Sequence, residues 1–127
     1  MNKAVYDSRF FVEFYYSKNQ VIQQKIGQKK RFLDKYVSAI VVHEVYNITL
    51  ARDGREVAKL RAASIKEEFK VIPVDDQIAQ LSAELRHKYN LSMGDSMIAA
   101  TAAKLKAVCI SDDPHFQQIK EIETAWI

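Results

Sequence analysis

The stretch from Leu91 to Lys106, LSMGDSMIAATAAKLK, decides the fold because it predicts one buried helix that begins with a carboxylate. Ile98, Ala99 and Ala102 share one face at helical spacing, and the alanines allow close packing against a neighbouring element. Asp95 precedes these residues by three, four and seven positions, so it lies on the same inward face. An unpaired charge directed at a core is costly, and we therefore expect the rest of the chain to supply partners for this carboxylate.

The composition predicts a single soluble domain. The chain has 127 residues, of which 48% are hydrophobic and 28% charged, as in an ordinary globular protein with a sizeable core. The first residues, MNKAVYDS, lack the apolar segment of a signal peptide, and no apolar run is long enough to span a bilayer. The single cysteine, Cys109, excludes an internal disulfide and a cysteine-based zinc cluster. We expect one cytoplasmic domain over residues 1–127.

Positive charge is concentrated in the first half of the chain, although the net charge is only +3. Residues 1–64 carry 12 Lys and Arg against 6 Asp and Glu, whereas residues 65–127 carry 7 against 10. The basic half favours a polyanionic partner, and an ordinary solvated surface is the alternative.

Short apolar segments alternate with helically spaced segments along the chain. Their composition predicts strands at Ala4–Tyr6, Tyr36–His43, Phe69–Val74 and Ala107–Ile110, and an edge strand at Thr124–Ile127. Helical segments are expected within Arg9–Tyr16, within Asn19–Leu33 with a break at Gly27, over Glu44–Leu50, over Asp53–Lys66, after the capping pair Asp75-Asp76, over the stretch described above and after Pro114. This order predicts an α/β/α sandwich around a mainly parallel central sheet.

Four carboxylates lie where these strands end or where a helix begins. Asp7 follows the first strand, Glu44 the second and Asp113 the strand that ends at Ile110, while Asp95 opens the central helix. Parallel strands end at one edge of a sheet, so the four side chains are expected to converge there. Packed carboxylates raise one another's pKa unless a cation lies between them, and oxygen ligands favour Mg²⁺ or Mn²⁺. Such cations activate water and neutralise the charge that develops when a phosphodiester is cleaved.

Each acid taken singly also has an ordinary explanation as a turn or helix-start residue. If that explanation holds for all four, the chain is a catalytically silent RNA-binding or interaction module. Strand alternation should direct the side chains of His43 and Glu44 to opposite faces, so we expect His43 in the core or in helix packing. His87 lies in a polar helical segment, and we expect it at the surface. No Ser-His-Asp or Cys-His set is apparent, so the sequence does not support covalent catalysis.

Four segments together resemble PIN-domain proteins and, in size, the VapC-type ribonuclease toxins of toxin–antitoxin pairs. The segments are AVYDSRFFVEFY, SAIVVHEVYN, GDSMIAATAAKLKA and VCISDDPHFQQI, and they occur in the family's order and spacing over nearly the whole chain. The resemblance implies a PIN-like fold. It also implies an acidic Mg²⁺ or Mn²⁺ site of Asp7, Glu44 (directly or through a water), Asp95 and Asp113, with Ser8, Ser111 and Asn47 in support.

The last segment departs from the family's pattern at one position and is ambiguous at another. A further acid often follows two residues after the last one, and here that residue is His115, which either lines the substrate path or lies at the surface. The Ser-x-Asp pattern and Phe116 select Asp113 as the fourth acid, with Asp112 facing solvent.

The resemblance further implies a metal-dependent endoribonuclease whose products carry a 5′-phosphate and a 3′-hydroxyl. It implies a homodimer and a cognate antitoxin whose C-terminal segment covers the acidic cleft. A PIN-like nuclease of RNA processing, without an antitoxin, is the alternative within the family. Candidate contacts to the RNA backbone are Lys25, Lys29, Lys30, Arg31, Arg52 and Arg55.

Overall fold

A five-stranded sheet, in which every neighbouring pair of strands runs parallel, forms the centre of the molecule. The structure, a computed structural model, describes residues 2–29 and 34–126, with residues 27–29 described by their backbone alone. The strand order is β3-β2-β1-β4-β5. The strands are β1 (Lys3–Tyr6), β2 (Asp34–Ser38), β3 (Lys70–Ile72), β4 (Val108–Ile110) and β5 (Thr124–Ala125).

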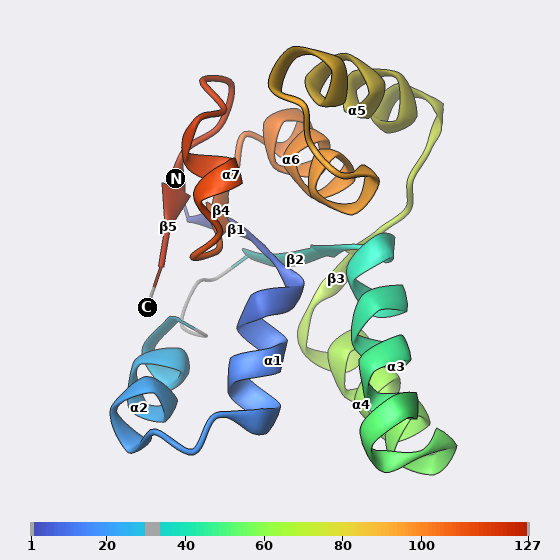
Figure 1. The fold of residues 1–127 in the computed structure, drawn as a ribbon, viewed down its shortest axis with the longest axis vertical. Helices are drawn as coiled ribbons and strands as arrows, with labels where there is room; N and C mark the ends of the chain where they lie inside the picture. The colour runs from blue at the N-terminus through green and yellow to red at the C-terminus, as the bar shows by residue number, and fades with distance from the viewer. Residues whose placement is uncertain (1, 30–33, 127) are drawn as a thin grey trace.

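Helices cover both faces of this sheet (Figure 1). Helices α5 and α6 lie on one side, and α1 to α4 lie on the other. The predicted α/β/α sandwich with a parallel sheet is therefore confirmed. The helices are α1 (Ser8–Tyr16), α2 (Gln20–Lys29), α3 (Ala39–Asp53), α4 (Arg55–Glu68), α5 (Asp76–Tyr89), α6 (Met93–Leu105) and α7 (Pro114–Gln117).

Helix α6 is the buried helix that the sequence predicts. Its N-cap is Ser92, whose side chain accepts a hydrogen bond from the backbone N–H of Asp95. Ile98, Ala99 and Ala102 are fully buried, and α6 packs against β1, β2 and β4. The small alanine side chains let the helix approach the sheet closely, which places its first turn at the edge where the strands end.

An aromatic cluster fills the opposite side of the sheet. Tyr6, Phe10, Phe11 and Phe69 are buried and meet edge to face, with ring centroids 4.7 Å apart for Tyr6 and Phe10 and 5.1 Å apart for Phe11 and Phe69. Phe10 and Phe11 are thus core residues that hold α1 against the sheet.

The predicted strand at Tyr36–His43 is wrong beyond Ser38. Strand β2 ends at Ser38, whose Oγ accepts a hydrogen bond from the backbone N–H of Ile40 and caps α3. The β-branched residues that follow belong to the first turn of α3, because that turn packs one face against the core and β-branched side chains suit a buried helix as well as a strand. His43 therefore lies exposed on α3, so of the two positions expected for it, in the core or in helix packing, the core position is wrong.

Two helix boundaries also differ from the predictions. Helix α2 continues through Gly27 without the predicted break. The helical segment predicted over Asn19–Leu33 includes residues 30–33, which lie outside the described part of the chain. Gly54, with φ +89°, separates α3 from α4, so Asp53 ends one helix instead of beginning the next. Leu60 of α4 is 71% exposed, although it is apolar.

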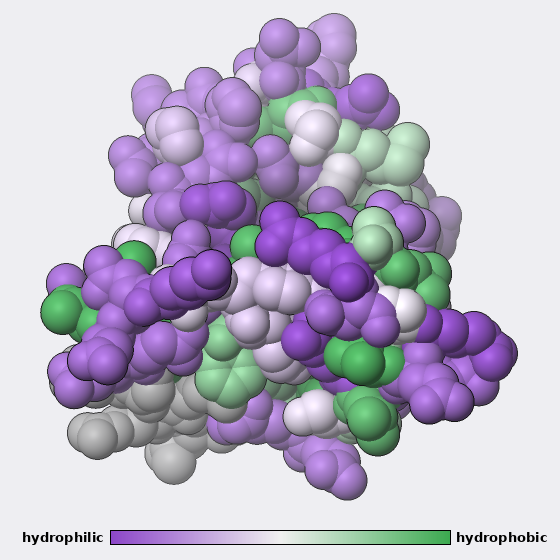
Figure 2. All heavy atoms as spheres, turned by 60° about the horizontal axis from the view of Figure 1, so that its bottom comes forward, coloured by the Kyte–Doolittle hydropathy of each residue, from purple (hydrophilic) through white to green (hydrophobic). Residues whose placement is uncertain are grey.

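The surface is mostly hydrophilic on the face formed by the far ends of α1 to α4 (Figure 2). Hydrophobic atoms on this face form small areas between hydrophilic side chains. Among the described residues, no helix combines the length and apolar character needed to cross a membrane.

Candidate metal centre

Four acids meet at the edge of the sheet where β1 and β4 end. Asp7 follows β1 and caps α1, and Asp113 follows β4 and caps α7. Asp95 lies in the first turn of α6. Glu44 lies in the second turn of α3 and not at a strand end, which corrects its predicted position, but its side chain still reaches the group. The structure thus places the four carboxylates that the sequence singles out at one edge of the sheet, near enough for their charges to interact. Among the described residues, the one group of three whose ligand atoms all lie within 4.8 Å of one another is Asp95, Asp113 and His115.

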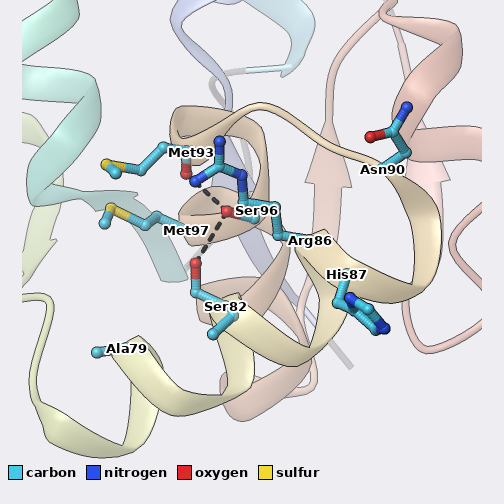
Figure 3. Close-up of a pocket in the computed structure, with 9 residues that line it drawn as sticks. Ala79, Ser82, Arg86, His87, Asn90, Met93, Ser96 and Met97 are labelled. Carbon is cyan, nitrogen blue, oxygen red and sulfur yellow. Dashed lines mark hydrogen bonds between the residues drawn. The ribbon is translucent and has the colours of Figure 1, made fainter.

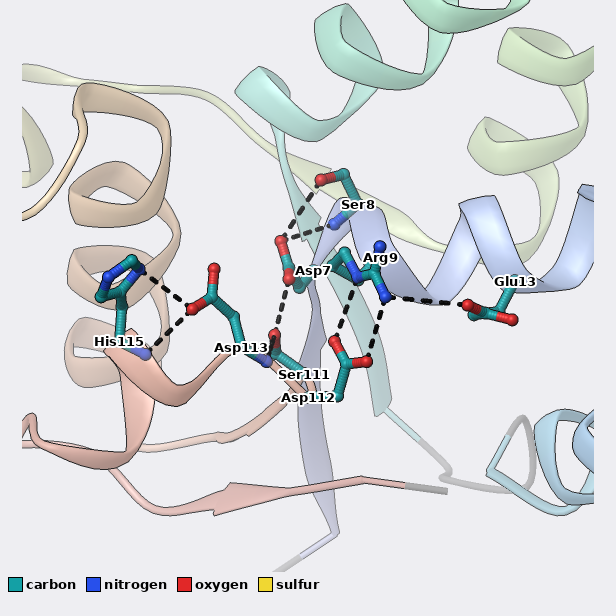
Figure 4. A network of polar contacts seen from close by, with 8 residues as sticks. All are labelled: Asp7, Ser8, Arg9, Glu13, Ser111, Asp112, Asp113 and His115. Atoms are coloured by element: carbon teal, nitrogen blue, oxygen red, sulfur yellow. Dashed lines mark hydrogen bonds and ion pairs between the residues drawn. The ribbon is translucent and has the colours of Figure 1, made fainter.

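Asp7 is the most deeply buried of the four acids, with 2% of its surface exposed. Its Oδ2 accepts a hydrogen bond of 2.6 Å from Ser111 Oγ, and its Oδ1 accepts one of 2.7 Å from the backbone N–H of Ser8 (Figure 4). Burial, together with the negative charges of Asp95 and Asp113, raises the pKa of Asp7 to about 6, and the hydrogen bonds from Ser111 and Ser8 limit this rise. Ser8 and Ser111 therefore orient this carboxylate.

Glu44 carries a buried oxygen atom without a partner. Its Oε1 is inaccessible to solvent and has no hydrogen-bond partner among the described residues. Burial, and next the charge of Asp7, raise the pKa of Glu44 to about 7. An unsatisfied buried carboxylate oxygen is costly, so this atom requires a proton or a cation.

Asp95 and Asp113 face each other together with His115. Burial raises the pKa of Asp95, and the charge of Asp113 raises it further. His115 Nδ1 lies 3.0 Å from Asp113 Oδ1 and 3.9 Å from Asp95 Oδ2. The His115 side chain is 64% exposed, so it lies at the surface and also borders the acids. This exposure agrees with the surface position, one of the two alternatives that the sequence left open for His115.

Asp112 lies apart from this group because Arg9 binds it. The Arg9 guanidinium donates to both carboxylate oxygens of Asp112, at 3.1 and 3.2 Å, and also approaches Glu13 (Figure 4). Asp112 is thus paired at the surface instead of simply facing solvent, and Asp113 is the acid beside Asp95. The sequence reasoning did not identify Arg9, which is 103 positions away from Asp112.

The donor set fits a hard divalent cation. Carboxylate side chains from four parts of the chain approach one another, and burial and neighbouring negative charges raise the pKa values of Asp7, Glu44 and Asp95. Among the described residues, the buried Glu44 Oε1 has no hydrogen-bond partner. Mg²⁺ and Mn²⁺ prefer such oxygen ligands, and either ion would remove the mutual repulsion.

The other predicted residues lie at different distances from the acids. Asn47 is exposed one turn after Glu44, and both border a hollow of about 410 Å³ that also contacts Met93 of α6. The guanidinium of Arg52 lies over the Tyr16 ring, 4.5 Å from its centroid. At a rise of 1.5 Å per residue, Arg52 lies about 12 Å farther along α3 than Glu44. Arg55 and Lys25 are exposed on α4 and α2, and the side chains of Lys29, Lys30 and Arg31 lie outside the described residues.

A second hollow, of about 460 Å³, lies between α5 and α6 (Figure 3). A hydrogen bond of 2.9 Å joins the hydroxyls of Ser82 and Ser96 across its floor, and Met93 and Met97 border it. His87 is exposed at its rim, which agrees with the surface position expected for it. None of the four acids lines this hollow.

Stability of the metal-free protein should fall as the pH rises through the range where these acids ionise. The folded-state pKa values of Asp7 and Glu44, about 6 and 7, exceed their ordinary values of 3.8 and 4.5. The folded protein therefore binds more protons than the unfolded chain between about pH 4 and pH 7, and the free energy of unfolding decreases over that interval. Urea titrations in EDTA should show this decrease, and the Asp7→Asn variant should show a smaller one. If the free energy of unfolding falls equally with pH in both proteins, the raised pKa does not belong to Asp7.

Gly94 provides the space for the Glu44 carboxylate. A Cβ atom at position 94 would lie 3.0 Å from Glu44 Oε2. We expect Gly94→Ala to lower the affinity for Mn²⁺ by about tenfold, as changes beside metal ligands typically do. The fold should be kept, since alanine favours helices more than glycine. Calorimetric titration with Mn²⁺ measures the affinity, and an unchanged value would show that Glu44 does not contribute.

The parallel sheet, the helices on both faces and the acids at the carboxyl edge define an α/β/α protein with a candidate cation centre. The PIN domain model matches residues 4–122, and the chain belongs to the PIN domain family. No curated protein matches the chain significantly.

Solved structures share the fold at low sequence identity. A chain of DNA-bound VapBC from Salmonella typhimurium is 17% identical with a TM-score of 0.80, covering 99% of this chain and 98% of that one. A chain of a toxin–antitoxin complex from Klebsiella pneumoniae is 20% identical with a TM-score of 0.76, at 98% and 100% coverage. Mycobacterium tuberculosis VapC20, described as a sarcin–ricin loop cleaving toxin, is 16% identical with a TM-score of 0.76, at 95% and 99% coverage.

Proposed function

We propose that this protein is a Mg²⁺- or Mn²⁺-dependent endoribonuclease and the toxin of a toxin–antitoxin pair. The observation that carries the nuclease assignment is the convergence of four carboxylates, one of which keeps a buried oxygen that has no hydrogen-bond partner in the described part of the chain. A catalytically silent module does not need such a group, because helix caps do not require the acids to face one another. Membership of the PIN domain family supports the same conclusion.

The four acids have two tasks in this proposal. Asp7, Asp95 and Asp113 would hold the cation, and Glu44 would complete the site directly or through a water. A bound Mg²⁺ or Mn²⁺ supplies Lewis-acid chemistry: it lowers the pKa of water and neutralises charge on a phosphodiester.

The surrounding residues position these acids. Ser8 and Ser111 fix both oxygens of Asp7, so this carboxylate keeps one orientation. Arg9 holds Asp112 away from the centre and prevents a fifth negative charge from joining it. Asp113 is the N-cap of the short helix α7, and its Oδ1 accepts a hydrogen bond of 2.9 Å from the backbone N–H of His115, which fixes the carboxylate.

The excess of positive charge in residues 1–64 supports RNA as the polyanion that reaches this centre. The candidate contacts Arg52 and Arg55 lie beyond the acids along α3 and α4, where they would bind backbone phosphates away from the cleaved bond. An RNA bound by phosphate contacts should dissociate more readily as the salt concentration rises.

Incubation with a panel of structured RNAs tests the nuclease assignment. We expect cleavage in Mg²⁺ or Mn²⁺, none in EDTA, and fragments with a 5′-phosphate and a 3′-hydroxyl. Equal cleavage in EDTA would contradict a metal mechanism. RNA binding without cleavage in either cation would support the silent module instead.

The fold neighbours from toxin–antitoxin complexes support the toxin assignment and predict contact with an antitoxin. Membership of the PIN domain family supports the expectation of a second copy of the chain. Co-expression with the product of the neighbouring gene should give a stable complex in which RNA cleavage is inhibited. If no complex forms, the toxin assignment fails, and a nuclease of RNA processing without an antitoxin becomes the better description.

A further inference from the structure

We propose that His115 is a nitrogen ligand of the cation and that it makes this centre prefer Mn²⁺ to Mg²⁺. This inference rests on the proposed function, because it assigns a further ligand to the same centre. It concerns a residue of this chain that occupies a position where the resemblance to PIN-domain proteins leads one to expect an acid.

The position of the imidazole is the first argument. One ligand atom each from Asp95, Asp113 and His115 lies within 4.8 Å of the other two. His115 Nδ1 is 3.0 Å from Asp113 Oδ1. Neighbouring ligand atoms on an octahedral ion with bonds of about 2.1 Å lie about 3 Å apart, so the imidazole and the carboxylate already have the separation of two ligands of one ion.

The local backbone is the second argument. Asp113 caps α7, and its Oδ1 already accepts a hydrogen bond from the backbone N–H of His115. The ring is therefore not needed to satisfy that oxygen. Pro114 at the start of α7 fixes the backbone between the two side chains, so they are held on the same side of the turn.

The chemistry of the donor set is the third argument. A site made only of carboxylates suits Mg²⁺, which demands hard oxygen ligands. An imidazole nitrogen suits first-row transition metals better than it suits Mg²⁺. Mn²⁺ stands lowest among those metals in the general order of affinities, but it is the one that also suits the carboxylate oxygens of this centre. Replacing an expected acid with histidine also removes one negative charge from a crowded group, which lowers the repulsion among the acids.

Metal titrations of the purified chain with Mn²⁺ alone and Mg²⁺ alone test the inference. We expect His115→Ala to weaken Mn²⁺ binding by at least about tenfold and to change Mg²⁺ binding by less than about threefold. His115→Asp should shift the preference toward Mg²⁺. His43→Ala is the matched control, because His43 is exposed beside Glu44 but lies outside the cluster. The exposed position of His115 means that these variants should fold, which circular dichroism checks.

Pulsed electron paramagnetic resonance of the Mn²⁺-loaded protein gives a readout that is independent of activity. A ¹⁴N coupling from a bound imidazole should be present in the wild type and in His43→Ala, and absent in His115→Ala. Mn²⁺ bound without that coupling, and with equal affinity in His115→Ala, would overturn the inference and leave the proposed function standing. If neither cation binds to the wild type, both the inference and the proposed function fail.

Discussion

Replacing Asp95 with asparagine is expected to lower the rate of RNA cleavage by about 10²–10⁴-fold. The substitution keeps the shape of the side chain but removes one of the charges that would hold the cation. A bound metal contributes several kcal/mol of charge stabilisation in the transition state, and each 1.36 kcal/mol is about tenfold in rate. The measurement is single-turnover cleavage of a responsive RNA in Mn²⁺.

The fold of the Asp95→Asn variant should be preserved or slightly stabilised. Burial and the neighbouring charge raise the pKa of Asp95, so a neutral side chain of the same shape relieves repulsion in the metal-free protein. Asp112→Asn is the matched control because Asp112 is a nearby acid that Arg9 already neutralises. Its cleavage rate should stay close to that of the wild type. An Asp95→Asn variant as active as this control would contradict the assignment of Asp95.

Replacing Phe10 with alanine should cost about 3–5 kcal/mol in the free energy of unfolding. Phe10 is fully buried, and its ring meets Tyr6 at 4.7 Å and Phe11 at 5.4 Å. Alanine would leave a cavity under the sheet and remove two edge-to-face contacts. Because a domain of this size is stable by only about 5–15 kcal/mol, a large share of its stability would be lost.

Urea unfolding measures this change, with Leu60→Ala as the control. Leu60 is 71% exposed, and its replacement should alter the free energy of unfolding by no more than about 0.5 kcal/mol. A loss below about 1 kcal/mol for Phe10→Ala would mean that the aromatic cluster does not hold α1 to the sheet as the structure indicates.

The sequence was sufficient to predict the layers of the fold and the meeting of the acids. Helix α6 could be predicted because helical spacing, an N-cap and an internal run of alanines agree with one another. The end of β2 could not, since a β-branched run suits a buried strand and a buried helix equally, and only the Ser38 cap distinguishes them. Glu44 therefore entered the predicted group for an incorrect local reason, although the position of α3 brings it there.

Contacts between distant residues explain the rest of the difference. The preference for Asp113 over Asp112 depends physically on Arg9, whose pairing across the chain has no local signal. The contact between Gly94 and Glu44 also has no local signal in the sequence, because the two residues belong to different helices. The position of the His115 side chain depends on the short turn at the start of α7. A sequence pattern predicts such a turn but not the direction of one side chain within it.

Proton release on Mn²⁺ binding tests most directly the claim that these acids form one cation site. The pKa values of Asp7 and Glu44 are about 6 and about 7, so near pH 6 the metal-free centre retains on the order of one proton, which a cation must displace. Calorimetry in two buffers of different ionisation enthalpy counts that proton. We predict release of about one proton near pH 6 and almost none near pH 8.5, with much weaker binding by Asp7→Asn. Binding without proton release at either pH, or equal binding by Asp7→Asn, would contradict the account.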